Sequence, residues 1–147
     1  MRKTIFSMLA LTAITVVTVA WLSDNGSFGG SEAVAASHLA TQTSSARSVT
    51  VKVTPQNVAG NAATWDFAIV LDTHSADLND DLVKSSLLLD GAGGRYAPVA
   101  WDGAPPGGHH REGVLRFKPP LPPPQSIELQ ITRAGEDAPR SFRWQLK

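Results

Sequence analysis

The sequence predicts an all-β protein, an immunoglobulin-like antiparallel β-sandwich of about seven strands, preceded by an N-terminal hydrophobic helix. The first observation is that residues 49–147 contain short segments in which apolar and polar residues alternate. The second is that turn residues separate these segments, and the whole chain has 10 prolines and 12 glycines. Seven such segments in about a hundred residues is the number expected of an immunoglobulin-like sandwich.

Each predicted strand places its apolar side chains on one face, because successive residues of a strand point to opposite sides. Residues 64–72 show the pattern most clearly, with Trp65, Phe67 and Ile69 on the same face. The other predicted strands are 49–55, 83–90, 95–101, 113–117, 126–133 and 140–146. Together they predict a core of Val51, Val53, Trp65, Phe67, Ile69, Leu71, Trp101, Leu115, Ile127, Leu129, Ile131, Phe142 and Trp144.

The N-terminal 22 residues have the pattern of a targeting or anchoring segment. Arg2 and Lys3 precede the uncharged, largely apolar run 4–22, which is typical of a signal peptide and also nearly the ~20 residues that a membrane-spanning helix needs. Trp21 favours an uncleaved anchor, whereas cleavage after Ala35 would release a secreted or periplasmic protein. Both alternatives place the following residues on the extracytoplasmic side.

The segment between this run and the first predicted strand, residues 23–48, is rich in Ser, Gly, Ala and Thr. Its composition predicts a flexible linker that leads to a β-sandwich domain at 49–147. One helical turn is expected between strands, with Asp77 as its N-cap. The proline run 119–124 predicts a stiff, extended connection.

The composition argues against several classes of function. The 13 basic and 13 acidic residues balance, so no basic surface for nucleic acid is indicated. The chain has no cysteine, which excludes disulfides and thiolate metal sites. No serine lies in a G-x-S-x-G motif, and no glycine-rich phosphate loop precedes a helix. We therefore expect a protein that is not an enzyme.

Three histidines follow or precede predicted strands, where the loops of a sandwich gather. His74 follows the strand at 64–72, and His109 and His110 precede the strand at 113–117. Imidazole nitrogen is a frequent ligand of Zn²⁺ and Cu²⁺. Asp72 and Asp102 lie close to these histidines in sequence and would add a ligand or orient a ring. The pattern predicts an extracytoplasmic Zn or Cu(II) binding module.

The alternative is a structural or protein-interaction domain of the cell envelope, in which the same histidines only fasten two loops to each other. Adjacent residues of a strand point to opposite faces, so His109 and His110 share one ion only where the backbone is irregular. A calcium loop is not supported. Asp77, Asn79 and Asp81 have its opening spacing, but leucines stand where its turn glycine and its glutamate are required.

The paired segments DTHS (72–75) and GGHHREGVLRF (107–117) resemble an uncharacterised family of exported or membrane-anchored prokaryotic proteins. The resemblance covers residues 49–147 and implies export and a compact β domain. The chain is also loosely similar to periplasmic copper-binding β-sandwiches. It departs from them because it has no methionine-rich loop and no histidine at the start of the domain.

Overall fold

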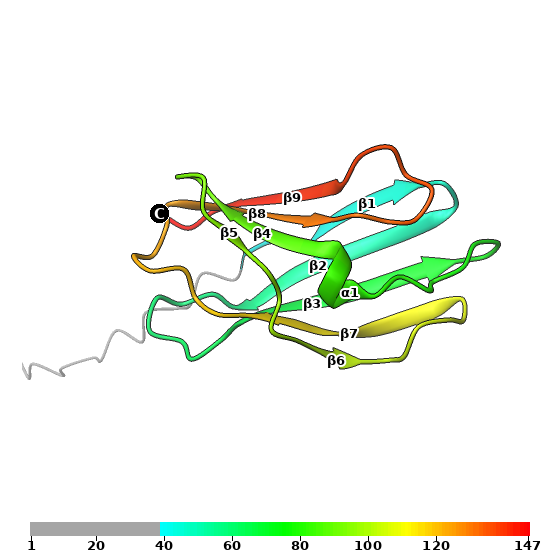
Figure 1. Ribbon diagram of the computed structural model, residues 1–147, viewed down its shortest axis with the longest axis horizontal. Helices are drawn as coiled ribbons and strands as arrows, with labels where there is room; N and C mark the ends of the chain where they lie inside the picture. The colour runs from blue at the N-terminus through cyan, green and yellow to red at the C-terminus, as the bar shows by residue number, and fades with distance from the viewer. Residues whose placement is uncertain (1–38) are drawn as a thin grey trace, which may run out of the picture. The chain divides into compact units, whose positions relative to one another are not determined.

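Two antiparallel β-sheets pack face to face in the structure, a computed structural model that describes residues 39–147. One sheet has the strand order β1-β2-β3-β7-β6, and the other has the order β5-β4-β8-β9 (Figure 1). The predicted all-β sandwich is thus confirmed. The predicted N-terminal hydrophobic helix at 1–22 lies outside the described residues, and within them no helix is long and apolar enough to cross a membrane.

The chain passes from one sheet to the other three times. Their bounds are β1 Gln42–Ala46, β2 Val49–Asn57, β3 Trp65–Thr73, β4 Ser86–Asp90, β5 Arg95–Tyr96, β6 Ala100–Gly103, β7 His110–Phe117, β8 Ser126–Ile131 and β9 Arg140–Gln145. The single helix α1, Leu82–Ser85, connects β3 to β4. Each connection between β3 and β4, between β5 and β6, and between β7 and β8 crosses from one sheet to the other.

Several boundaries differ from the sequence prediction. The first residues of the predicted strand 83–90 belong to α1, and β7 begins at His110 rather than at Gly113. The predicted linker 23–48 is wrong at its end, because β1 forms there and pairs with β2 from Gln42↔Val53 to Ala46↔Val49. The predicted strand 95–101 divides into β5 and β6 in different sheets, with the buried Pro98 between them. The helical turn is capped by Asp81, whose side chain accepts from two backbone N–H groups, rather than by Asp77.

The core lies between the sheets and consists mainly of the alternate residues of β2, β3, β7, β8 and β9, with Leu78, Leu82 and Leu88 added from the segment between β3 and the end of β4. All of the predicted core residues are buried except Trp101, which is half-buried. Phe67 packs edge-on against Phe117 at 5.6 Å between ring centroids, and it contacts Trp144 at 5.9 Å. Phe117, at the end of the predicted strand 113–117, is also buried, whereas four residues of the core were not predicted, namely Val49, Leu78, Leu82 and Leu88.

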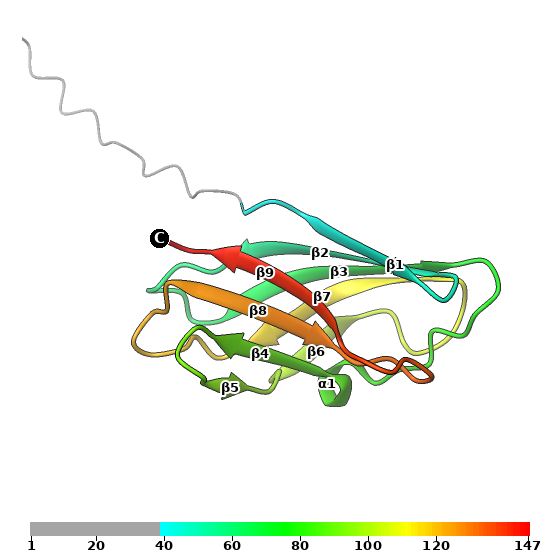
Figure 2. The ribbon, with the colours of Figure 1, turned by 90° about the horizontal axis from the view of Figure 1, so that it is seen from above.

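The two ends of the sandwich differ in the segments that lie there (Figures 1 and 2). The described chain begins and ends at one end, where the Trp144 indole donates to the Ala40 carbonyl and Leu146 N–H to the Gln125 carbonyl. The opposite end gathers four connections, which we call the loop end: residues 47–48, 74–81, 104–109 and 132–139. Both histidine-containing segments contribute to the loop end.

Candidate functional site

Arg140 fastens the β1–β2 hairpin to the other sheet at the loop end. Its guanidinium is buried and makes five hydrogen bonds. Two go to the Glu136 carboxylate at 2.9 and 2.5 Å, and three go to the carbonyls of Ser44, Ala46 and Val49 at 2.8–2.9 Å. The Arg140 guanidinium holds the pKa of Glu136 below its ordinary value, although burial opposes this shift.

Two further arginines donate hydrogen bonds to Asp80, Arg111 from β7 and Arg133 from the connection after β8. Arg133 donates from Nε to the Asp80 carboxylate at 2.8 Å and from Nη2 to the Asp77 carbonyl at 2.7 Å. Arg111 donates to the carbonyls of Asp80 and Ala104 at 2.6 and 3.0 Å. Both guanidinium groups are buried, and burial lowers the pKa of Arg111. Three of the four connections are thus joined through these two side chains.

The strand pattern itself directs these arginines inward. Arg140 continues the buried alternation of Phe142 and Trp144 on β9, and Arg111 continues that of Leu115 and Phe117 on β7. At these positions an apolar residue would pack into the core, but the end of the sandwich offers carbonyls that need donors. A buried guanidinium has five N–H groups with which to satisfy them. The loop end is therefore held mainly by arginines.

The tip of the β1–β2 hairpin has a strained backbone. Arg47 and Ser48 occupy the two central positions of its turn with φ of 45° and 62°. Residues other than glycine and asparagine are uncommon in this region of φ. Arg140 holds one side of this turn, and the Thr73 hydroxyl donates to the Ser48 carbonyl at 2.8 Å on the other. The surrounding contacts thus fix a conformation that the sequence does not favour locally.

The two histidine-containing segments meet through their main chains, since Thr73 N–H donates to the His109 carbonyl at 2.8 Å. Their imidazoles do not form a common cluster. His74 and His109 are exposed, and within residues 39–147 no group of three or more His, Asp or Glu side chains is arranged to hold a metal ion. The predicted Zn or Cu(II) site consequently stays a prediction.

His110 lies on the outer face of the first sheet, directly opposite Asp72 in the β3–β7 register. Its Nδ1 is 2.5 Å from the Asp72 carboxylate, and its Nε2 is 3.4 Å from the Glu112 carboxylate. The hydrogen bond to Asp72 is the main cause that raises the pKa of His110. Because both ring nitrogens face carboxylates, the protonated ring, which donates from both, fits this position best. Lys52 approaches Asp72 at 3.8 Å.

Asp102 does not join the histidines. It lies opposite Val114 on the exposed face, four residues along β7 from His110, which is ~13 Å of extended chain. Its carboxylate instead accepts from Arg116 at 3.1 Å. Of the five predicted site residues, the structure thus brings only Asp72 and His110 into side-chain contact.

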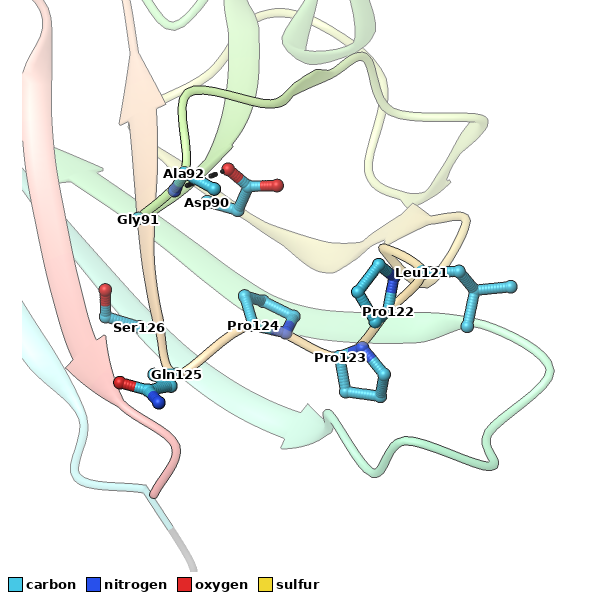
Figure 3. A pocket seen from close by; sticks show the side chains of 9 residues that line it. All are labelled: Asp90, Gly91, Ala92, Leu121, Pro122, Pro123, Pro124, Gln125 and Ser126. Atoms are coloured by element: carbon cyan, nitrogen blue, oxygen red, sulfur yellow. Dashed lines mark hydrogen bonds between the residues drawn. The ribbon is translucent and has the colours of Figure 1, made fainter.

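A concave region lies at the end of the sandwich opposite the loop end, where the proline run meets the β4–β5 turn (Figure 3). It is a shallow groove of about 380 Å³ lined by Pro122, Pro123 and Pro124 on one side and by Gly91 and Ala92 on the other. Figure 3 shows the Leu121 side chain directed away from the prolines, and this side chain is 77% exposed.

The β4–β5 turn beside this groove is fixed by Asp90. Its carboxylate accepts from Ala92 N–H and Gly94 N–H at 2.9 and 2.6 Å and from the Tyr96 hydroxyl at 2.9 Å. These bonds, that of Gly94 first, lower the pKa of Asp90. The Asp90 carboxylate is thus engaged in the turn, and the other polar side chains that line the groove are Gln125 and Ser126.

The chain was compared with protein-family models, with curated proteins and with solved structures, and no match was found in any of the three. The resemblance of DTHS and GGHHR to an exported family therefore stays a prediction.

Proposed function

We infer that the sandwich is immunoglobulin-like. The order β2-β3-β7-β6 corresponds to strands A-B-E-D of that fold, and β5-β4-β8-β9 corresponds to C′-C-F-G. The crossings from β3 to β4 and from β7 to β8 agree with the crossings from B to C and from E to F. In this assignment β1 is an additional strand beside A.

We propose that this immunoglobulin-like domain is an extracytoplasmic interaction or structural module, held at its N-terminal side, that presents the loop end to another protein. The observation that carries the proposal is the set of three buried arginines that fix the loops. Preformed loops on a rigid sandwich are the usual place of binding surfaces. The described chain begins at the opposite end, so a tether there leaves the loop end accessible.

The buried carboxylates of the loop end support the fastening role. Asp80 and Glu136 form ion pairs with Arg133 and Arg140, and His110 has a carboxylate at each ring nitrogen. Fastening loops accounts for these contacts.

Photo-crosslinking in intact cells tests the proposal. A photoreactive phenylalanine analogue replaces His109 at the loop end, and a matched chain carries it at Ser141, which is exposed on the outer face of the other sheet. We expect a discrete crosslinked protein from position 109, reduced when Arg140→Met loosens the loops, and none from position 141. Equal products from both positions, or none from position 109, would refute the role of the loop end.

Zn or Cu(II) binding through His74, His109 and His110 is the competing proposal. It requires the imidazoles of His74, His109 and His110 to converge, whereas His110 contacts Asp72 and Glu112 and the other two imidazoles are exposed. The structure contains no observation that favours this rearrangement over the existing contacts.

A further inference from the structure

The free edge of β1 differs from the other sheet edges in residues 39–147. The β6 edge has only four residues, carries the exposed Asp102 and lies between prolines. β5 has two residues. The β9 edge is occupied, because the Gln42 side-chain amide hydrogen-bonds both the backbone N–H and the backbone carbonyl of Arg143. Short length, charge and coverage are the means by which proteins protect sheet edges from pairing.

β1 has none of these protections along its outer edge. Its sequence is QTSSA, without charge, proline or bulge, and it pairs in regular register with β2. The two-residue turn at 47–48 makes Ala46↔Val49 a hydrogen-bonded pair. Along β1, the backbone N–H and carbonyl groups of successive residues therefore point alternately toward β2 and away from it. The N–H and carbonyl groups of Thr43 and Ser45 are therefore directed away from β2, and both residues are exposed.

We propose that β1 is a self-association site, at which a second copy of this chain adds its own β1 in antiparallel orientation about a two-fold axis at Ser44. The pattern of the edge is complementary to itself. Around this axis, Thr43 of one copy pairs with Ser45 of the other, and the two pairs form four main-chain hydrogen bonds. No like charges meet at the centre.

The side chains on the outer face support the same arrangement. Hydroxyl pairs already join β1 to β2, with Thr41 to Thr54 at 2.7 Å and Ser45 to Thr50 at 2.9 Å. A second β1 would continue this series of Ser and Thr contacts across the axis, and such cross-strand pairs favour pairing. The result is one continuous sheet of ten strands, built from two five-stranded sheets.

The two-fold axis makes the two β1 strands antiparallel, so the described chains of the two copies begin at opposite ends of the pair. The proposal concerns an edge that the loop-end role does not use, so it stands or fails independently of that role.

Oxidative crosslinking of the full chain tests the proposal directly, because the natural sequence has no cysteine. In the proposed pair, the two Ser44 Cα atoms would be ~4.5 Å apart, within the range that a disulfide spans. Purified Ser44→Cys treated with diamide should form a covalent dimer at least about tenfold faster than Asp102→Cys, which places the thiol on the β6 edge. Equal rates would overturn the proposal.

Second substitutions in the Ser44→Cys background separate pairing from chance collision. Thr43→Pro removes an outward N–H without touching the β1–β2 hydrogen bonds, and it should lower the rate at least about tenfold while Trp fluorescence stays native. Ser45→Lys and Thr50→Lys lose the same hydroxyl contact and add the same charge, but only Ser45 lies on the edge. Only Ser45→Lys should slow the reaction; equal effects would contradict edge pairing.

The same variant distinguishes a second copy from a different protein. If Ser44→Cys crosslinks to another protein in cells while the purified chain stays monomeric, the edge receives a foreign strand and self-association is wrong.

Discussion

The clearest stability test is the replacement of Arg140 by methionine. The substitution keeps a long side chain in the cavity but removes five hydrogen bonds. It also leaves the Glu136 carboxylate, whose side chain is only 8% exposed, without its main partner. Breaking a buried ion pair by removing one partner costs about 3–5 kcal/mol. Arg133 remains 3.9 Å from Glu136, which keeps the expected loss near the lower limit.

Urea unfolding followed by fluorescence of the buried Trp65 and Trp144 measures this loss, with Arg47→Met as the matched control. Arg47 also pairs with an acid, Asp137, but both side chains are largely exposed, so its replacement should cost at most about 1 kcal/mol. Adding Glu136→Gln to Arg140→Met should restore about 1–2 kcal/mol, because the unpaired charge is removed. If Arg140→Met is no more destabilising than Arg47→Met, the role assigned to the buried arginine is wrong.

Three further predictions concern the turn and two titrating groups. Replacing Arg47-Ser48 by Asn-Gly, which suits positive φ, should raise the free energy of unfolding by about 1–2 kcal/mol; a decrease in thermal unfolding assays would show that the turn is not strained. The hydrogen bond from Arg143 is the main cause that lowers the pKa of Glu128 to about 2, and bonds from Gln130 and Ser141 add to it. The contribution of Glu128 to stability is therefore complete above pH ~4.5 and is lost as the pH falls toward 2. Glu128→Gln should flatten this part of the stability profile by about 2 kcal/mol, and an unchanged slope would contradict the assignment. Because the pKa of His110 is raised, its contribution to stability is present below pH ~6.5 and is lost as the pH rises through the pKa of the folded state. Asp72→Asn should lower this pKa in an NMR titration of the imidazole ring. An unchanged pKa would exclude the contact.

Period-two patterns predicted the strands that form the core. Residues 65–71, 127–131 and 142–144 alternate strictly, and a sandwich with one dry face per sheet is the fold that buries them. The division of 95–101 and the strand at 42–46 were missed for the same reason. β5 has two residues, and β1 consists mostly of serine and threonine, so neither has an apolar pattern to detect.

The candidate site was predicted less well, because its contacts join distant parts of the chain. Arg140 and the carbonyl that it binds at Ser44 are 96 residues apart. A local signal did exist. Arg133 and Arg140 each extend an inward-facing apolar series by one step of two residues, and Arg111 extends the series of Leu115 and Phe117 by two steps, across Gly113. Arginine is usually solvent-exposed, so the pattern alone did not indicate burial. The histidines drew attention by their chemistry, but only His110 among the three has side-chain partners in the described residues.

We propose that the polar groups of the loop end fasten its loops and do not form a metal site. Isothermal titration calorimetry with Zn²⁺ and Cu²⁺, on the natural chain and on His74→Ala and His110→Ala, tests this claim most directly. We predict the same weak, non-stoichiometric heats from all three proteins. One-to-one binding by the natural chain that is lost in both variants would contradict the account and establish the histidine site instead.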